Sequence, residues 1–137
     1  HFGRFAPQNR PLDYAICNIH HIFPKDHCIS QGYSREKWNS IINKTPISAS
    51  SNREIGGYAP SVYLGRLEKK GSVSSADLDS YVETHWIDHD LLRKDEFQDF
   101  IIDRAKKLLN EVEQVTGRKI SGRDSEEVRK AFGEALV

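Results

Sequence analysis

Two adjacent histidines, His20 and His21, carry the side chains of this 137-residue sequence that are best suited to chemistry. They lie in the run IHHIFPK at residues 19–25, whose β-branched and aromatic residues predict a strand. Because successive side chains of a strand point to opposite faces, the two imidazoles would have different tasks. A neutral imidazole can bind a metal ion or accept a proton near neutral pH. We expect one histidine to face a metal ion and the other a substrate, although a histidine pair on a strand can also be purely structural.

Two asparagines further along the chain extend this pattern. Asn43 and Asn52 are separated by nine positions. The amide oxygen of Asn52 is a hard ligand of the kind that Mg²⁺ or Mn²⁺ accepts beside water and phosphate oxygens. Histidines and asparagines together are therefore compatible with metal-assisted hydrolysis of a phosphate ester.

These segments resemble a known family of nucleases. The runs IHHIFPK, INKTPIS from Ile42, SN at residues 51–52 and PSVYL from Pro60 are similar to HNH endonucleases of the His-Me finger (ββα-metal) superfamily. The branch they resemble most is the C-terminal nuclease domain of GmrSD-type, ParB-like-domain-linked restriction proteins. The core resemblance covers residues 15–70, and a weaker one covers the run DEFQDFIIDRAKKL from Asp95.

The resemblance implies a role for each of the four residues. His21 would be the general base that removes a proton from the attacking water. His20 stands where many members have Asp or Glu and would be a metal ligand. Asn43 corresponds to the middle Asn, which holds the base and its loop in orientation. Asn52 would be the second metal ligand, contributed by the start of the helix that follows the strands.

The histidine at position 20 is the departure from the family pattern, because it leaves no anionic protein ligand. We expect weaker Mg²⁺ binding and an affinity that falls as His20 is protonated at low pH. The implied cofactor is one divalent cation, Mg²⁺ or Mn²⁺, with Ni²⁺ also possible. Lys25 and Arg53 flank the two ligand-bearing segments and are candidates for binding phosphate, or they lie in solvent.

The function implied by the resemblance is that of a divalent-metal-dependent DNA endonuclease. It would be the cleavage module of a restriction or anti-phage defence protein that acts on foreign or modified DNA. An N-terminal NTP-hydrolysing sensor domain of the parent chain would be its partner. A nuclease fold that binds nucleic acid without cutting it is an alternative, but the presence of His21, Asn43 and Asn52 together favours an intact site.

A zinc-stabilised binding module is the second alternative. Zinc-ligand side chains lie within twelve residues at Cys17, His20 or His21, His27 and Cys28. Adjacent residues such as His27 and Cys28 seldom reach one tetrahedral centre, so the spacing argues against zinc. We interpret Cys17 as a small strand residue and Cys28 as a loop thiol.

The elements that would position these residues form an α+β fold with one domain over 1–137. We expect an irregular lead-in at 1–14, a ββα-metal core at 15–70 and a helical extension at 75–137. Within the core, residues 14–23 predict a strand ended by Pro24, and Thr45 and Ile47 around Pro46 are expected to be extended. Residues 50–57 are a loop or a short helix.

Helices are predicted where apolar residues recur at helical spacing. Ser34 would cap a short helix with Trp38, Ile41 and Ile42, and a second helix from Pro60 to Gly71 would bury Tyr63, Leu64 and Leu67. In the extension, Ser75 would cap a helix with Leu78, Tyr81, Val82 and His85. The longest helix would run from Asp95 to Gly117 with a packed stripe of Phe97, Phe100, Ile101, Ala105, Leu108, Val112 and Val115. A last helix from Asp124 would group Val128, Ala131, Phe132 and Ala135. We expect surface or core roles for His85 and His89.

Composition limits the remaining possibilities. The net charge is zero, but residues 1–70 carry ten Lys/Arg and five Asp/Glu while residues 71–137 carry ten and fifteen. A basic first half could meet phosphates, although an ordinary solvated surface would have the same composition. No apolar run approaches a membrane span, so no membrane contact is expected. Two cysteines favour a reducing, cytoplasmic location. Because the chain contains no Met, we expect a piece excised from a longer protein.

Overall fold

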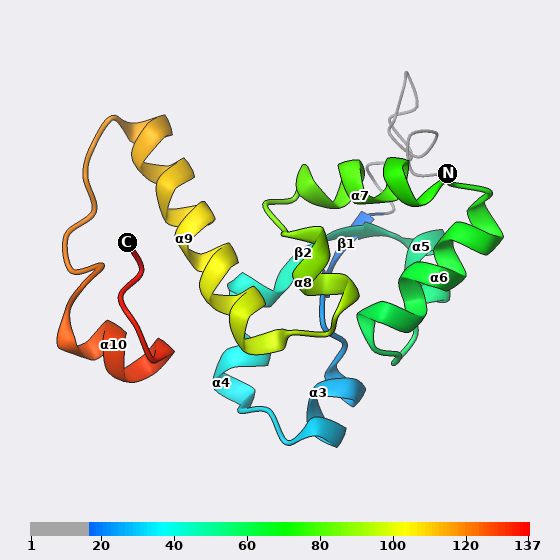
Figure 1. Cartoon of the computed structure of the whole chain (residues 1–137), viewed down its shortest axis with the longest axis horizontal. Coiled ribbons are helices and arrows are strands. Elements are labelled where there is room, and N and C mark those ends of the chain that lie inside the picture. The colour runs from blue at the N-terminus through cyan, green and yellow to red at the C-terminus, as the bar shows by residue number, and fades with distance from the viewer. Residues whose placement is uncertain (1–16) are drawn as a thin grey trace.

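The computed structural model describes residues 17–137, apart from the side chains of residues 17, 49 and 50. The α+β class is confirmed, because a small two-stranded sheet is combined with a larger helical part (Figure 1). The predicted lead-in at 1–14 and the first residues of the predicted strand lie outside the described residues. In chain order the elements are β1 (Cys17–His21), α3 (Lys25–Gln31), α4 (Arg35–Trp38), the 3₁₀ helix η1 (Ile41–Asn43), β2 (Lys44–Ser48), α5 (Ala49–Ile55), α6 (Pro60–Gly71), α7 (Ser75–Glu83), α8 (His89–Arg93), α9 (Phe97–Thr116) and α10 (Glu126–Phe132).

The sheet pairs β1 with β2 in antiparallel register, from Cys17 opposite Ser48 to His21 opposite Lys44. Just beyond the paired residues, Ile22 N donates to Asn43 O over 2.7 Å. Hydrogen-bonded and non-hydrogen-bonded pairs alternate along such a ladder. Because the pair of Ile22 is hydrogen-bonded, the pairs of His21 and Ile19 exchange no backbone hydrogen bonds. Pro46 opposite Ile19 falls in this second class, which tolerates proline because no N–H is needed there. The predicted extended segment around Pro46 is confirmed.

Helix α5 follows β2 without a loop. The Ser48 hydroxyl accepts a hydrogen bond from Ser51 N over 3.2 Å and caps the helix at its start. Of the two alternatives for residues 50–57, the short helix is therefore correct. The helix packs against both strands, so β1, β2 and α5, which follow one another as strand, strand and helix, are also neighbours in space.

Several predicted helices are confirmed, with shifted ends. Pro60 is the first residue of α6, and Tyr63, Leu64 and Leu67 are buried along it. The cap of α7 is Ser74 rather than Ser75, and its side chain accepts from Asp77 N. Helix α9 ends at Gly117 as predicted, where φ is +70°. The last helix begins after Ser125 instead of Asp124, and Ala135 lies outside it.

Two short helices were not predicted. The strand ends at His21, two residues before the predicted end at Phe23, and Pro24 directly precedes the first turn of α3, because its fixed φ of −60° suits a helix start. Cys28 consequently lies in a helix with its side chain fully buried, so its interpretation as a loop thiol is wrong. The second unpredicted helix is α8, whose cap Asp88 accepts from Asp90 N and Leu91 N.

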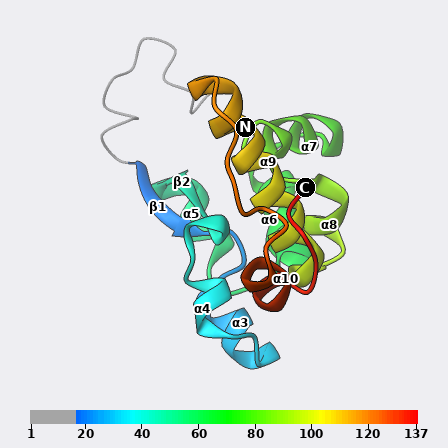
Figure 2. The ribbon, with the colours of Figure 1, turned by 90° about the vertical axis from the view of Figure 1, so that its left-hand side faces the viewer.

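The predicted apolar stripe of α9 is only partly packed. Phe97, Phe100, Ile101 and Ala105 are buried, whereas Val112 and Val115 are 48% and 75% exposed. The reason is that the C-terminal half of α9 extends away from the sheet (Figures 1 and 2), while the chain end and α10 pack against earlier residues of the helix, Ile102 and Ala105.

The core forms two clusters. The larger one joins β1, α3 and α4 to helices α5 to α9, and includes Phe23, Trp38 and Phe100. The smaller one consists of Ile102 and Ala105 of α9 with Leu136 from the chain end, and Phe132 packs against both clusters. None of the helices described is long and apolar enough to cross a membrane.

Candidate functional site

Asn43 is the centre of the best-defined polar arrangement near the histidines. Its side chain is fully buried. Its Oδ1 accepts from Phe23 N over 2.8 Å, and its Nδ2 donates to Phe23 O over 3.0 Å and to Trp38 O over 2.8 Å. One amide group thus fixes the chain immediately after β1 to the end of α4.

His21 lies between the two segments that Asn43 joins. Its Nε2 is 3.1 Å from Asn39 Oδ1, and its ring meets the Trp38 ring edge-on with centroids 5.5 Å apart. When the Asn39 oxygen accepts from Nε2–H, Nδ1 is the unprotonated nitrogen of the neutral ring. Asn39 follows the last residue of α4, and no sequence motif signals its contact with a residue 18 positions earlier.

His20 and Asn52 lie on the same side of the sheet. Thr45, opposite His20, and Ile47 line an apolar cavity of about 60 Å³ together with Ile55 of α5. Helix α5 therefore covers the face that carries His20, and Asn52 precedes Ile55 by three residues on this helix. Both side chains are half-buried, and among the side chains described no hydrogen bond joins them.

Lys25 and Arg53, the two candidate phosphate-binding residues, are both exposed. Lys25 is the first residue of α3, four positions after His21, and Arg53 follows Asn52 on α5. The two cations thus lie on the elements that follow β1 and β2.

Arg104 of α9 was not identified from the sequence. Only 4% of it is exposed, yet its guanidinium reaches the backbone on both sides of Asn43. Nη1 donates to Ile42 O over 2.7 Å and to Lys44 O over 3.0 Å, and Nε donates to His85 O over 3.1 Å. Burial lowers the pKa of Arg104 to about 10, which still leaves it charged at neutral pH.

His85 occupies the interior side of the sheet. Its Nδ1 is 2.7 Å from Thr45 Oγ1, and it lines the apolar cavity. Burial, assisted by the nearby Arg104 charge, lowers the pKa of His85 below its ordinary value. The expected core role of His85 is in keeping with this position.

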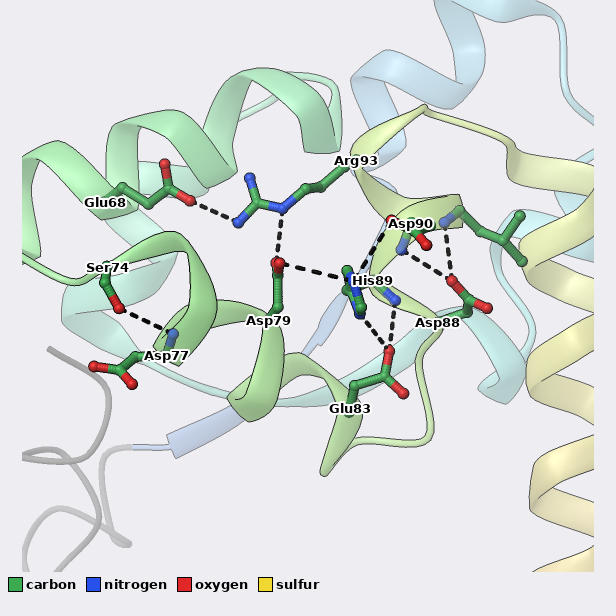
Figure 3. A network of polar contacts seen from close by, with 10 residues as sticks. Glu68, Ser74, Asp77, Asp79, Glu83, Asp88, His89, Asp90 and Arg93 are labelled. Atoms are coloured by element: carbon green, nitrogen blue, oxygen red, sulfur yellow. Dashed lines mark hydrogen bonds and ion pairs between the residues drawn. The ribbon is translucent and has the colours of Figure 1, made fainter.

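His89 belongs to a network of charged side chains contributed by three helices (Figure 3). Its Nδ1 is 2.9 Å from Glu83 Oε2, and Asp79 and Asp90 lie near Nε2. The hydrogen bond to Glu83 and the surrounding carboxylates raise the pKa of His89. Arg93 extends the network, with Nη2 2.6 Å from Glu68 Oε2 of α6 and Nε 2.7 Å from Asp79 Oδ1 of α7. This network ties α6, α7 and α8 together.

The donor set for a metal ion is small. Among the described residues, no group of three or more His, Cys, Asp or Glu side chains is arranged to hold a metal. His20 and Asn52 offer one imidazole nitrogen and one amide oxygen, a set that fits a divalent cation whose remaining ligands are water and a substrate phosphate. The zinc alternative fits less well, because Cys28 is buried in the core and burial raises its pKa to about 12.

Comparison with known proteins gives one limited similarity. No protein-family model matches this chain, and no solved structure matches it. The chain is 40% identical over 65 residues to an uncharacterized protein of Methanocaldococcus jannaschii. The match covers 42% of this chain and 11% of that protein, so the chain spans only a small part of the length of this relative.

Proposed function

We propose that this chain is a divalent-metal-dependent DNA endonuclease with a ββα-metal core formed by β1, β2 and α5. The observation that carries the proposal is the triple hydrogen bonding of Asn43 to Phe23 and Trp38. This is the task that the resemblance assigns to the middle Asn: holding the base and its loop. The strand–strand–helix order and the common side of His20 and Asn52 support the same assignment.

In the proposed reaction, His21 is the general base. With Nε2–H donated to Asn39, the Nδ1 lone pair accepts a proton from a water molecule. The water oxygen forms a bond to phosphorus while the P–O3′ bond breaks, and the leaving oxygen takes a proton from solvent. The edge of Trp38 restricts rotation of the imidazole, and Asn43 keeps Trp38 and the chain after His21 in place.

The proposed cation ligands are His20 and Asn52. A bound cation would neutralise charge on a nonbridging oxygen and on the leaving oxygen. Because both ligands are uncharged, the protein alone holds the cation weakly, and DNA and cation should bind with positive coupling.

The biological role follows from the resemblance. We propose that the chain is the cleavage module of a restriction or anti-phage protein directed at foreign or modified DNA. Recognition of the target belongs to a nucleotide-hydrolysing domain elsewhere in the parent protein. On its own, the module should cut with little sequence preference and with strong salt dependence.

Nicking of supercoiled plasmid with and without Mg²⁺, Mn²⁺ or Ni²⁺ tests this function. Wild type should nick only with a divalent cation, and His21→Ala should be inactive with an unchanged unfolding midpoint. His89→Ala is the matched control, because it removes an imidazole outside the candidate site. Wild-type nicking by His21→Ala would refute the base assignment, and DNA binding by wild type without nicking would favour an inactive binding module.

A further inference from the structure

Lys44 is the residue directly opposite His21 in the sheet. Since Ile22 and Asn43 form a hydrogen-bonded pair, the neighbouring pair of His21 and Lys44 is of the non-hydrogen-bonded kind. In such pairs the Cα atoms are only about 4.5 Å apart and the side chains lie close together on one face. The register thus places the Lys44 side chain on the same face of the sheet as the proposed general base, as its direct cross-strand neighbour.

The backbone of Lys44 is fixed, whereas its side chain is not committed to an acidic partner. Its carbonyl accepts from Arg104 Nη1 over 3.0 Å, and the preceding Asn43 is fully buried. Among the described residues, no carboxylate lies within ion-pair distance of the Lys44 ammonium, although this side chain is half-buried. A half-buried cation without a counter-ion is suited to an anionic ligand.

The other side chains around His21 leave room for such a role. Asn39 and Trp38 contact the ring from α4, and Arg35 lies 6.0 Å from the Trp38 ring centroid. These neighbours are amide, aromatic or cationic, so the described contacts of His21 add no negative charge that would repel a phosphate. By contrast, Lys25 and Arg53 are exposed and neither is paired with His21 across the sheet.

We infer that Lys44 binds a nonbridging oxygen of the DNA phosphodiester that His21 acts on. The inference rests on the proposed function for the identity of the reacting group, but it adds a residue and a ligand to that site. The Lys44 ammonium holds the phosphate beside His21 Nδ1. Negative charge that develops on the nonbridging oxygens during attack of the water would be stabilised by the same contact.

Single-turnover nicking compares wild type with Lys44→Gln, Lys44→Arg and Lys130→Gln. Lys44→Gln keeps a polar side chain, one atom shorter, but removes its charge, and should nick at least about 10-fold more slowly at saturating protein. Lys44→Arg should recover most of this rate because it restores the charge. Lys130→Gln on α10, which lies far from the sheet (Figure 1), should leave the rate unchanged.

Binding of a fluorescent DNA duplex without divalent cation separates this inference from the proposed function. The logarithm of the DNA association constant falls linearly with the logarithm of the salt concentration. Loss of one phosphate contact should make this slope less steep by about one in Lys44→Gln and should leave it unchanged in Lys130→Gln. If wild type binds but never nicks, the proposed function fails while a reduced slope would still support the phosphate contact. An unchanged slope, or nicking by folded Lys44→Gln at the wild-type rate, would overturn the inference.

Discussion

At the scale of single residues, Asn43 is the side chain whose role can be read most directly from its contacts. It is fully buried and satisfies the N–H and the C=O of Phe23 with a single amide. Asn43→Ala leaves Phe23 N without this acceptor and leaves Phe23 O with only the weak Cys28 thiol donor at 3.5 Å. At about 1–3 kcal/mol for each buried group, the variant should lower the free energy of unfolding by about 2–5 kcal/mol. Urea denaturation followed by tryptophan fluorescence would measure the loss.

Two further variants sharpen this prediction. Asn43→Asp can still accept from Phe23 N but cannot donate to Phe23 O or Trp38 O, so it should be as destabilising as Asn43→Ala. Asn18→Ala is the control, because Asn18 lies exposed on β1 and its loss should change stability by less than about 0.5 kcal/mol. Stability of Asn43→Asp close to that of wild type would contradict the donor role.

His85 makes a prediction about pH. Its pKa is lower in the folded state than in the unfolded chain because of burial and Arg104. A depressed folded pKa means that the unfolded chain binds the proton more readily, so this contribution to stability is present above about pH 6.5 and is lost as pH falls. His85→Asn keeps a hydrogen-bonding group for Thr45 but does not titrate. It should lose less stability than wild type between about pH 7.5 and about pH 5.5 in urea denaturation.

His89 is the matched control for His85, because its pKa is shifted in the opposite direction. A raised folded pKa adds stability that is full below about pH 6.5 and disappears as pH rises through the folded value. His89→Asn should therefore lose more stability on acidification than wild type, by a small amount because the ring is partly exposed to solvent. Identical pH profiles for the two variants would show that neither shift exists.

Sequence reasoning could name residues with family-specific spacing, but it could not name their supporting neighbours. Asn43 was expected to hold a loop, and its hydrogen bonds to Phe23 and Trp38 are of that kind. Asn39 and Arg104 carry no motif, since their partners lie 18 and about 60 positions away and only the tertiary fold brings them close. A buried arginine that donates to carbonyls looks like any surface arginine in sequence.

At the scale of elements, helix α9 supports the start of β2 through Arg104. One guanidinium donates to four carbonyl groups, those of Ile41, Ile42, Lys44 and His85. Arg104→Met would leave them without this donor and should lower the free energy of unfolding by about 2–4 kcal/mol. Arg104→Lys keeps the charge, but its single nitrogen cannot take the separate positions of Nε and Nη1 that contact the four carbonyls, so an intermediate loss is expected.

Lys107→Met provides the control for this helix. Lys107 pairs with Asp103 over 2.8 Å at the surface of the same helix, and such i,i+4 pairs contribute only about 0.3–0.5 kcal/mol. Chemical denaturation of the three variants should therefore rank Arg104→Met as least stable and Lys107→Met as close to wild type. Equal stability of Arg104→Met and Lys107→Met would show that α9 does not support β2.

Helices and strands could be predicted where residues such as proline or glycine determine their ends locally. Proline at the first turn fixed the start of α6, and Gly117 fixed the end of α9. Helix α3 is not predicted, because Pro24 indicates the end of a strand as readily as the start of a helix. Pairing of β1 with β2 could not be derived from periodicity, because each strand has only five residues.

At the scale of the whole molecule, the two halves of the chain carry net charges of opposite sign. The basic first half contains both strands and the proposed site, while the acidic second half contains the carboxylates of Asp79, Glu83 and Asp90 that surround His89. The negative charge of those carboxylates is partly neutralised by ion pairs with His89 and Arg93 (Figure 3). DNA should accordingly approach from the side of β1 and β2 and not from the side of α7 and α8.

The end of the chain is held in place by a second core cluster, and this makes the last prediction. Leu136 is 4% exposed and packs with Ile102 and Ala105, and its backbone pairs with Arg123 through two hydrogen bonds of 2.8 Å. Leu136→Ala should lower the free energy of unfolding by about 2–4 kcal/mol, since a buried leucine leaves a cavity. Val137→Ala is the adjacent control, because Val137 is 74% exposed and its loss should cost less than about 0.5 kcal/mol.

This comparison also separates stability from the proposed chemistry. Ile42, which precedes Asn43, packs against the same cluster, so the chain end supports the proposed site only through the core. At a temperature where both variants are folded, plasmid nicking by Leu136→Ala and Val137→Ala should proceed at the wild-type rate, while their thermal midpoints differ. A slower rate in folded Leu136→Ala would contradict this prediction and would mean that the cluster also positions the proposed site through Ile42.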